Sequence, residues 1–212
     1  MKVELISVTP DAEKIMAYCA RVSSPNQDKE EIAGLFRYCI KNGHWSIFEM
    51  ANLCIEIKTS RAISAQILRH WSFSFQEFSQ RYAAVDDSGV EIYAARRQDN
   101  KNRQNSIADL PDNIVKEWEQ RQLKNWRDSF EHYQWALDNS IAKECARFVL
   151  PLSTSTKMYM NGTVRDWIHY INLRAGNGTQ KEHMDIANSI KDIFITQFPV
   201  IGEAAGWITT EE

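Results

Sequence analysis

The stretch of this chain richest in reactive side chains is RHWSFSFQEFSQRY, residues 69–82. It holds two arginines, a histidine, a glutamate and three serines among five aromatic residues. Guanidinium groups make bidentate, charge-assisted hydrogen bonds to phosphate and carboxylate oxygens, while aromatic rings stack on planar groups. The segment therefore favours a site for a nucleotide monophosphate or a flavin.

The same stretch also permits a purely structural interpretation. Ser74 and Glu77 have the spacing of a helix capping box, and Glu77 and Arg81 have that of a favourable i,i+4 ion pair. That interpretation leaves Arg69 and His70 without a role, and exposed cations at a helix end contribute only about 0.3–1 kcal/mol. A ligand-binding interpretation explains more of the residues in this segment than a structural one does.

Hydrophobic periodicity indicates the elements that must position these residues. Residues 50–60 alternate apolar and polar side chains, as a strand with one buried face does. Residues 61–70 have helical spacing, which brings Gln66, Arg69 and His70 together at one helix end. A second donor-rich helix begins at the capping box Thr163–Asp166 and carries Arg174 in its last turn.

The rest of the chain is predicted from the same periodicity. We expect a strand at 1–9, helices at 28–41, 114–139, 141–150 and 180–198, a polar surface loop at 96–113, and a turn with possible strand character at 153–162. The apolar stripe of the helix at 114–139 suits either a core or a subunit contact.

Composition restricts the function classes. The 212 residues carry a net charge of -3, without the basic excess of a generic nucleic-acid or anionic-membrane binder. The N-terminal MKVELISVTP lacks the apolar core of a signal peptide, so we expect a soluble, cytoplasmic protein that binds neither membranes nor nucleic acid. The four cysteines are expected to be reduced and packed in the core. No H-E-x-x-H, C-x-x-C or P-loop motif is present, so no metal site is expected.

With these residues in view, the sequence resembles the flavin-dependent thymidylate synthases, whose signature is R-H-R, seven residues, then S. Arg69-His70-Trp71 is followed after seven residues by Ser79. Four further segments resemble the family in order and approximate spacing: ARVSSP at 20–25, GHWSIFE at 43–49, ECARFVLPLSTST at 144–156 and INLRAGNGTQ at 171–180.

The resemblance implies a fold and a reaction. The fold would be a single α+β domain over residues 1–212, a small, mainly antiparallel sheet flanked by helices, in a homotetramer whose subunits share the sites. The reaction would be the FAD-dependent methylation of dUMP to dTMP, with 5,10-methylenetetrahydrofolate as one-carbon donor and NADPH as reductant.

The resemblance also implies roles for individual residues. Arg174 would activate the pyrimidine, since a permanent cation stabilises negative charge developing on the ring, and Ser79 and Arg81 would hold the phosphate. The dUMP pocket would comprise Gln66, Ile67, Leu68, Arg69, Glu77, Phe78, Ser79, Gln80, Arg81, Arg147 and Arg174. FAD would be held by Ser46, Arg69, His70, Trp71, Glu77, Thr163, Val164, Arg165 and His169.

The sequence departs from the family pattern at four positions. Trp71 stands in place of arginine, Thr163 and His169 in place of asparagines, and Gly178 in place of histidine. A catalytically reduced relative that still binds dUMP or flavin is therefore one alternative. A single-strand nucleic-acid-binding module, suggested by the aromatic residues and the basic loop at 96–103, is another.

Overall fold

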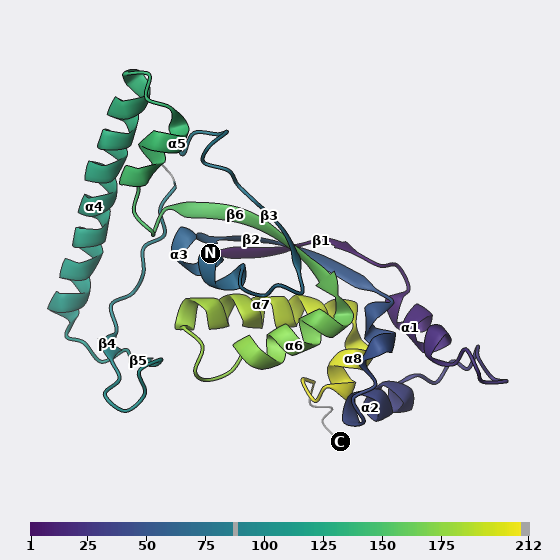
Figure 1. Ribbon diagram of the computed structural model, residues 1–212. Helices are drawn as coiled ribbons and strands as arrows, with labels where there is room; N and C mark the ends of the chain where they lie inside the picture. Colours follow the sequence, from purple (N-terminus) through teal and green to yellow (C-terminus); the bar gives the residue numbers. More distant parts are fainter. Residues whose placement is uncertain (87–88, 209–212) are drawn as a thin grey trace.

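The computed structural model describes residues 1–86 and 89–208 (Figure 1). Its centre is an antiparallel sheet in the order β1-β2-β6-β3, formed by Lys2–Val8, Asn52–Ser60, Ser155–Thr163 and Ser74–Glu77. β2 and β6 pair without a register shift from Asn52 opposite Thr163 to Ser60 opposite Ser155. The expected α+β class with a small antiparallel sheet is confirmed.

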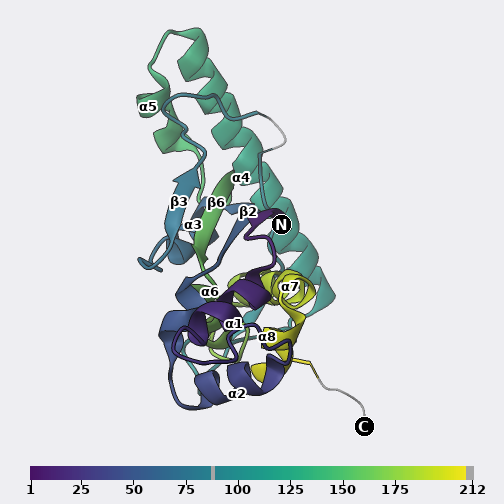
Figure 2. The same cartoon turned by 90° about the vertical axis from the view of Figure 1, so that its right-hand side faces the viewer.

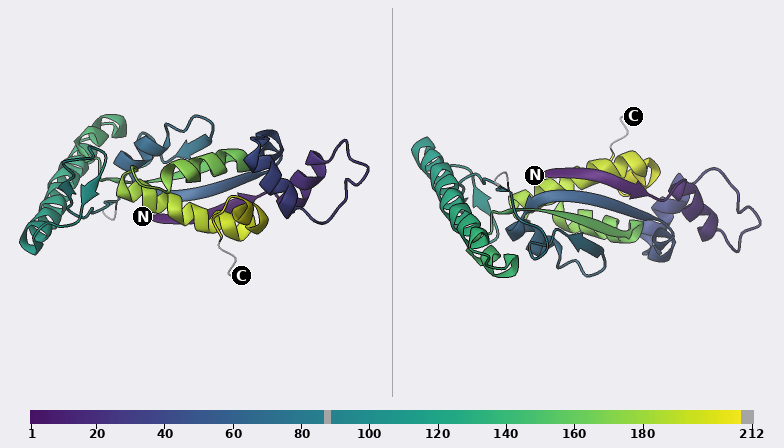
Figure 3. Two further views of the ribbon diagram at one scale, coloured as in Figure 1. Left: turned by 90° about the horizontal axis from the view of Figure 1, so that it is seen from below. Right: turned by 90° about the horizontal axis from the view of Figure 1, so that it is seen from above.

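The two inner strands alternate between a helix-covered face and an open face. Leu53, Ile55 and Ile57 of β2 are fully buried, as are Met158 and Met160 of β6, because they point toward the helices. The polar positions between them belong to the other face. Seen from below, helices lie in front of the strands, whereas from above the strands come first (Figure 3).

The helices fall into three groups around this sheet. α6 (Val164–Arg174) and α7 (Lys181–Gln197) cover the buried face, and α3 (Arg61–Ile67) extends from β2. α1, α2, α8 and the 3-10 helix η1 gather at one end (Figure 2), and α4, α5 and the 3-10 helix η2 lie at the other (Figure 1). At the first end, α1 is Ala12–Ala20, α2 is Ala33–Lys41, α8 is Pro199–Ala204 and η1 is Trp45–Glu49. At the other end, α4 is Asp112–Asp138, α5 is Lys143–Ala146 and η2 is Arg147–Val149.

The predicted capping box at the start of α6 is present. The Thr163 hydroxyl accepts from the Asp166 amide at 3.2 Å, and the Asp166 carboxylate accepts from the Thr163 amide at 3.0 Å. One turn along, the Trp167 indole donates to the Leu53 carbonyl at 2.9 Å. The helix start is thus fixed both in itself and against the sheet.

The long helix α4 has its own small core. Trp126 and Tyr133 are buried with Val85 and Ala146, away from the main core. Its other tryptophans are exposed, Trp135 by 62%. One part of the apolar stripe is therefore core, and the remainder forms an exposed surface.

Several local predictions were wrong. For residues 153–162 the predicted turn is wrong but the possible strand character is confirmed, since they contain most of the inner strand β6. Tertiary pairing on both sides overrides their Ser, Thr, Asn and Gly content. Ser74–Glu77 is the edge strand β3 and not a helix start. The helix expected at 141–150 shortens to α5 and η2, and the expected loop at 96–113 contains a hairpin of β4 (Arg97–Gln98) and β5 (Ser106–Ile107).

The cysteine prediction holds only in part. All four thiols are free, and Cys39 is buried. Cys19 and Cys54 are half-buried, however, and Cys145 is exposed. Among the described residues, no helix is both long and apolar enough to cross a bilayer.

Gly162 should tolerate no side chain. A Cβ at this position would lie 2.5 Å from Cδ1 of Phe73, whose buried ring is held edge-on against Trp167 at 4.7 Å. We expect Gly162→Ala to lower the free energy of unfolding by about 1–3 kcal/mol, as overpacking does. Gly176→Ala is the control, since a Cβ there meets no heavy atom within 4 Å. Urea unfolding at matched protein concentration measures both, and equal midpoints would contradict the packing argument.

Candidate functional site

Part of the predicted site forms where the end of α6 meets the turn after α3. Nε of Arg174 donates a hydrogen bond of 3.0 Å to Nε2 of His70. The turn is closed by a bond of 3.0 Å from the His70 amide to the Ile67 carbonyl. We call this group the first cluster, and it consists of Gln66, Arg69, His70, Trp71 and Arg174.

The protonation state of His70 follows from this geometry. Because Nε2 accepts a hydrogen bond from a guanidinium, the ring is neutral and carries its proton on Nδ1. Burial, together with the positive charges of Arg174 and Arg69, lowers the pKa of His70 to about 4. At neutral pH, His70 orients the guanidinium of Arg174 without cancelling its charge.

The arginines of the predicted site differ in their partners. Arg81 and Arg165 each contact a carboxylate, as Arg61 and Arg96 do elsewhere in the chain. Arg69, Arg147 and Arg174 have no carboxylate oxygen within 4.0 Å among residues 1–86 and 89–208. These three cations are available to an anionic or electron-rich ligand.

A second cluster follows β3 and lies beside α5. It consists of Ser79, Gln80, Arg81 and Arg147. Arg81 pairs with Glu144 at 3.2 Å, but both side chains are 54% exposed, so the pair is weak and exchangeable. Gln80 is buried, and its Nε2 has no hydrogen-bond partner in the described part of the chain. A buried donor left unpaired is costly, which favours a ligand or another chain as its partner.

A third cluster lies at the start of α6, beside η1. It consists of Ser46, Thr163, Val164, Arg165 and His169. Arg165 contacts Glu49, and the exposed His169 ring lies 4.5 Å from the ring of Trp45. A hollow of about 620 Å³ is lined here by Ser46, Arg165 and the rings of Tyr38, His44 and Trp45.

Helix α6 keeps the first and third clusters apart. Thr163 caps its first turn and Arg174 ends its last. At about 1.5 Å per residue, the eleven residues of α6 span about 16 Å. Apart from Glu77 of β3 and His169 in the middle of α6, the residues predicted to hold FAD therefore fall into two groups, one at each end of this helix.

Four predicted site residues lie outside the three clusters, namely Glu77, Ile67, Phe78 and Leu68. The Glu77 carboxylate accepts from Arg61 at 2.8 Å and from the Thr156 hydroxyl at 2.9 Å, so its predicted ion pair with Arg81 is wrong. Ile67 is fully buried, as is Val164 of the third cluster, so neither residue offers accessible surface to a ligand. Phe78 packs against the core beside α4. Leu68, in contrast, is 37% exposed next to Arg69.

Comparison with known proteins identifies the family. The sequence model for the thymidylate synthase complementing protein family matches residues 4–200. The chain belongs to this family of enzymes, the flavin-dependent thymidylate synthases. The predicted resemblance is thereby confirmed.

Two curated relatives and one solved structure illustrate the similarity. A probable flavin-dependent thymidylate synthase of Paramecium bursaria Chlorella virus 1 is 54% identical over 98% of this chain and 100% of the viral protein. The flavin-dependent thymidylate synthase of a Synechocystis strain is 52% identical over 92% of this chain and 90% of its own. The UMP/dUMP methylase PolB of Streptomyces cacaoi, solved with 5-Br dUMP, has a TM-score of 0.82 at 25% identity, covering 96% and 93% of the two chains.

Sequence reasoning missed the residues that surround the first cluster. His183 had no assigned role, yet it is buried and its Nε2 lies 3.0 Å from the Tyr170 hydroxyl. Arg96 pairs with the buried Glu182 at 2.5 Å, and Gln66 donates to Gln180 at 2.6 Å. The one sequence feature that pointed to these residues was the i,i+4 spacing of Tyr170 and Arg174, which places the two side chains next to each other on a helix.

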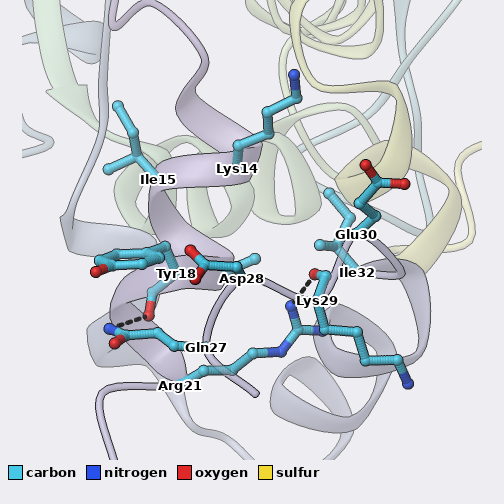
Figure 4. A pocket seen from close by; sticks show the side chains of 10 residues that line it. Lys14, Ile15, Tyr18, Arg21, Gln27, Asp28, Lys29, Glu30 and Ile32 are labelled. Atoms are coloured by element: carbon cyan, nitrogen blue, oxygen red, sulfur yellow. Dashed lines mark hydrogen bonds between the residues drawn. The ribbon is translucent and has the colours of Figure 1, made fainter. Parts of the chain in front are cut away.

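A further hollow holds none of the predicted site residues. It measures about 720 Å³ and lies between α1 and residues 27–32 (Figure 4). Arg21 lines it, but its guanidinium donates to the backbone carbonyls of Lys29 and Glu31. This arginine therefore anchors a loop rather than awaiting a ligand.

The buried histidines should make stability fall in acid. Burial also lowers the pKa of His183 to about 4, with smaller contributions from Arg174 and His70. Below the unfolded pKa of about 6.5 the unfolded chain binds more protons than the native one. The free energy of unfolding should therefore decrease between pH 6.5 and about 4, by up to about 1.4 kcal/mol per pH unit for each histidine.

Urea unfolding at pH 7, 6 and 5 measures this dependence. His183→Gln should make the loss of stability with falling pH shallower than in the native chain, whereas replacing the exposed His132 on α4 by Gln should not. Parallel curves for all three proteins would show that His183 does not fold as a buried neutral group.

Proposed function

We propose that this enzyme methylates dUMP to dTMP in an FAD-dependent reaction, with 5,10-methylenetetrahydrofolate as one-carbon donor and NADPH as reductant. The observation that carries the proposal is the half-buried Arg174 guanidinium, which is oriented by a neutral histidine and has no carboxylate partner within the described chain. Such a cation suits a substrate on which negative charge develops. The names of the relatives support the same reaction.

In this proposal Arg174 acts on the pyrimidine. Its full positive charge would stabilise the negative charge that builds on the ring oxygens, which makes C5 a better nucleophile toward the one-carbon unit. His70 would hold the guanidinium by Nε, so that the terminal nitrogens are left for the base. Arg69 would lie beside them as a further donor.

The second cluster would bind the phosphate of dUMP. Arg147 has no competing carboxylate, and the exposed pair of Arg81 with Glu144 exchanges easily for a phosphate oxygen. Buried Gln80 offers its unpaired amide donor, and Ser79 adds a hydroxyl. Together these groups match a dianion better than a neutral ligand.

The third cluster fits one part of FAD. The hollow of about 620 Å³ offers stacking rings, the Ser46 hydroxyl and Arg165, which suit the planar and phosphate groups of a dinucleotide. Bound FAD would supply the hydride that completes the methyl group. Trp71, 92% exposed in the first cluster, would offer a stacking surface where relatives have a charge.

We further propose a homotetramer with shared sites, in a soluble, cytoplasmic enzyme formed by a single domain. The three clusters lie on different parts of the chain, and Trp71, Tyr82 and Phe148 are each at least 79% exposed beside them. Large exposed rings next to incomplete sites favour coverage by a second copy. Small molecules, rather than nucleic acid, would be its other partners.

Arg174→Ala should abolish turnover. Removing one preorganised donor to developing negative charge typically lowers kcat by about 10²–10³-fold, and here the whole cation is lost. Formation of dTMP from dUMP in the presence of FAD, NADPH and methylenetetrahydrofolate measures the effect. Replacing the exposed Arg127 on α4 by Ala is the control. Unchanged activity in Arg174→Ala would remove its assigned role.

Flavin retention should separate an active synthase from a reduced relative. After incubation with FAD and removal of free cofactor, we expect a visible flavin band that shifts when dUMP is added. Trp71→Ala should weaken retention because it removes the stacking surface. A chain that binds dUMP but retains no flavin would point to a nucleotide-binding relative without this chemistry.

A further inference from the structure

Tyr170 and His183 form a buried polar pair directly behind the first cluster. Each side chain is 1% exposed, and the Tyr170 hydroxyl lies 3.0 Å from Nε2 of His183. Tyr170 comes from α6 and His183 from the first turns of α7. Within residues 1–86 and 89–208, this bond pairs the Tyr170 hydroxyl with the His183 imidazole, and a bond between two deeply buried polar groups restricts the rotation of both rings.

This pair braces the ring of His70. The Tyr170 ring meets His70 edge-on at 4.9 Å between centroids, and His183 meets it at 6.1 Å and an angle of 86°. Tyr170 is held in turn by Phe73 and Trp167, both at 5.8 Å. The orientation of His70 therefore depends on two rings that cannot turn independently of the core.

The contacts form one connected path from α7 to Arg174. His183 bonds to Tyr170, Tyr170 packs on His70, and His70 accepts the Nε proton of Arg174. The charged groups around the path are Arg69, Arg174 and Glu182. The Glu182 carboxylate is already engaged by Arg96 at 2.5 Å and by Gln180 at 2.9 Å.

The groups that lead to Arg174, namely His183, Tyr170 and His70, are neutral, and this neutrality matters for the charge of Arg174. A carboxylate would hold Arg174 more strongly than an imidazole does, but it would also neutralise the guanidinium. A neutral acceptor fixes the direction of the cation and leaves its charge for the substrate. His70 makes a single hydrogen bond to Arg174, so its own orientation must be fixed by the rings of Tyr170 and His183 that pack against it.

We propose that Tyr170 and His183 are positioning residues for Arg174: the hydrogen-bonded pair holds His70, and His70 aims the guanidinium at the pyrimidine. This inference rests on the function proposed above. Neither residue touches the substrate, and their effect passes entirely through His70. Misplacement of a reacting group by about 1 Å can cost up to about 100-fold in rate.

Three variants test the inference. Tyr170→Phe keeps the ring against His70 but removes the hydroxyl, and His183→Leu keeps the bulk but removes the imidazole. His183→Gln restores a polar group near the position of Nε2. We expect the first two to lower kcat about tenfold while KM for dUMP changes less than about twofold, and the glutamine variant to recover most of kcat.

A second measurement reads Arg174 directly, without turnover. In uniformly ¹⁵N-arginine-labelled enzyme, the hydrogen-bonded Nε–H of Arg174 should exchange slowly with water and give its own signal, assigned by its loss in Arg174→Lys. That signal should broaden or vanish in Tyr170→Phe and His183→Leu and persist in His183→Gln. Thermal unfolding of each variant serves as the folding control.

The outcomes separate this inference from the proposed function. If the native chain forms no dTMP but the Nε–H signal responds to the variants as expected, the reaction is wrong and the positioning stands. If dTMP forms and neither kcat nor the Nε–H signal of Arg174 changes in Tyr170→Phe and His183→Leu, the proposed positioning role is wrong. Equal losses in all three variants, in step with their melting temperatures, would also overturn it in favour of a general packing role.

Discussion

The unbroken antiparallel pairing of β2 with β6 is the constraint on which the rest of the structure depends. Because the strands run in opposite directions, α3 leaves the sheet at one end and α6 begins at the other. α6 must then return beneath the sheet, and eleven residues bring Arg174 to the turn that carries His70. A β2–β6 register shifted by one residue would leave Ile55 and Met160 on opposite faces of the sheet and move the start of α6.

The arginines around the site differ in whether a carboxylate neutralises their charge. Arg61, Arg96 and Arg165 hold carboxylates and so tie segments of the chain together. Arg69, Arg147 and Arg174 lie among neutral or aromatic groups, and in the described chain none of them is compensated. A cation without a counterion is unfavourable, and burial together with the charge of Arg174 lowers the pKa of both His70 and His183. Such cost is typical of functional sites rather than of scaffolds.

The sequence predicted the elements with strong periodicity and missed those set by distant partners. The capping box at Thr163 and the strand at 50–60 are local features, and the structure contains both. β6 was predicted only as a turn with possible strand character, because its Ser, Thr, Asn and Gly content favours turns and only pairing on both sides makes it an inner strand. The site residues were predicted from the family signature, and the structure brings Arg174 against His70. The contact of Tyr170 with His183 joins two helices and leaves no local pattern.

The length of α6 has a consequence for how this protein can change over time. Its two ends carry different parts of the proposed sites, about 16 Å apart. In an assembly with shared sites, a copy damaged at Arg165 and another damaged at Arg174 could together still contribute one intact site. Substitutions of Arg165 in one copy and of Arg174 in another would then reduce activity less than both substitutions in the same chain. Selection on these residues would therefore act on the assembly, and mixed assemblies could mask mutations that are harmful in uniform ones.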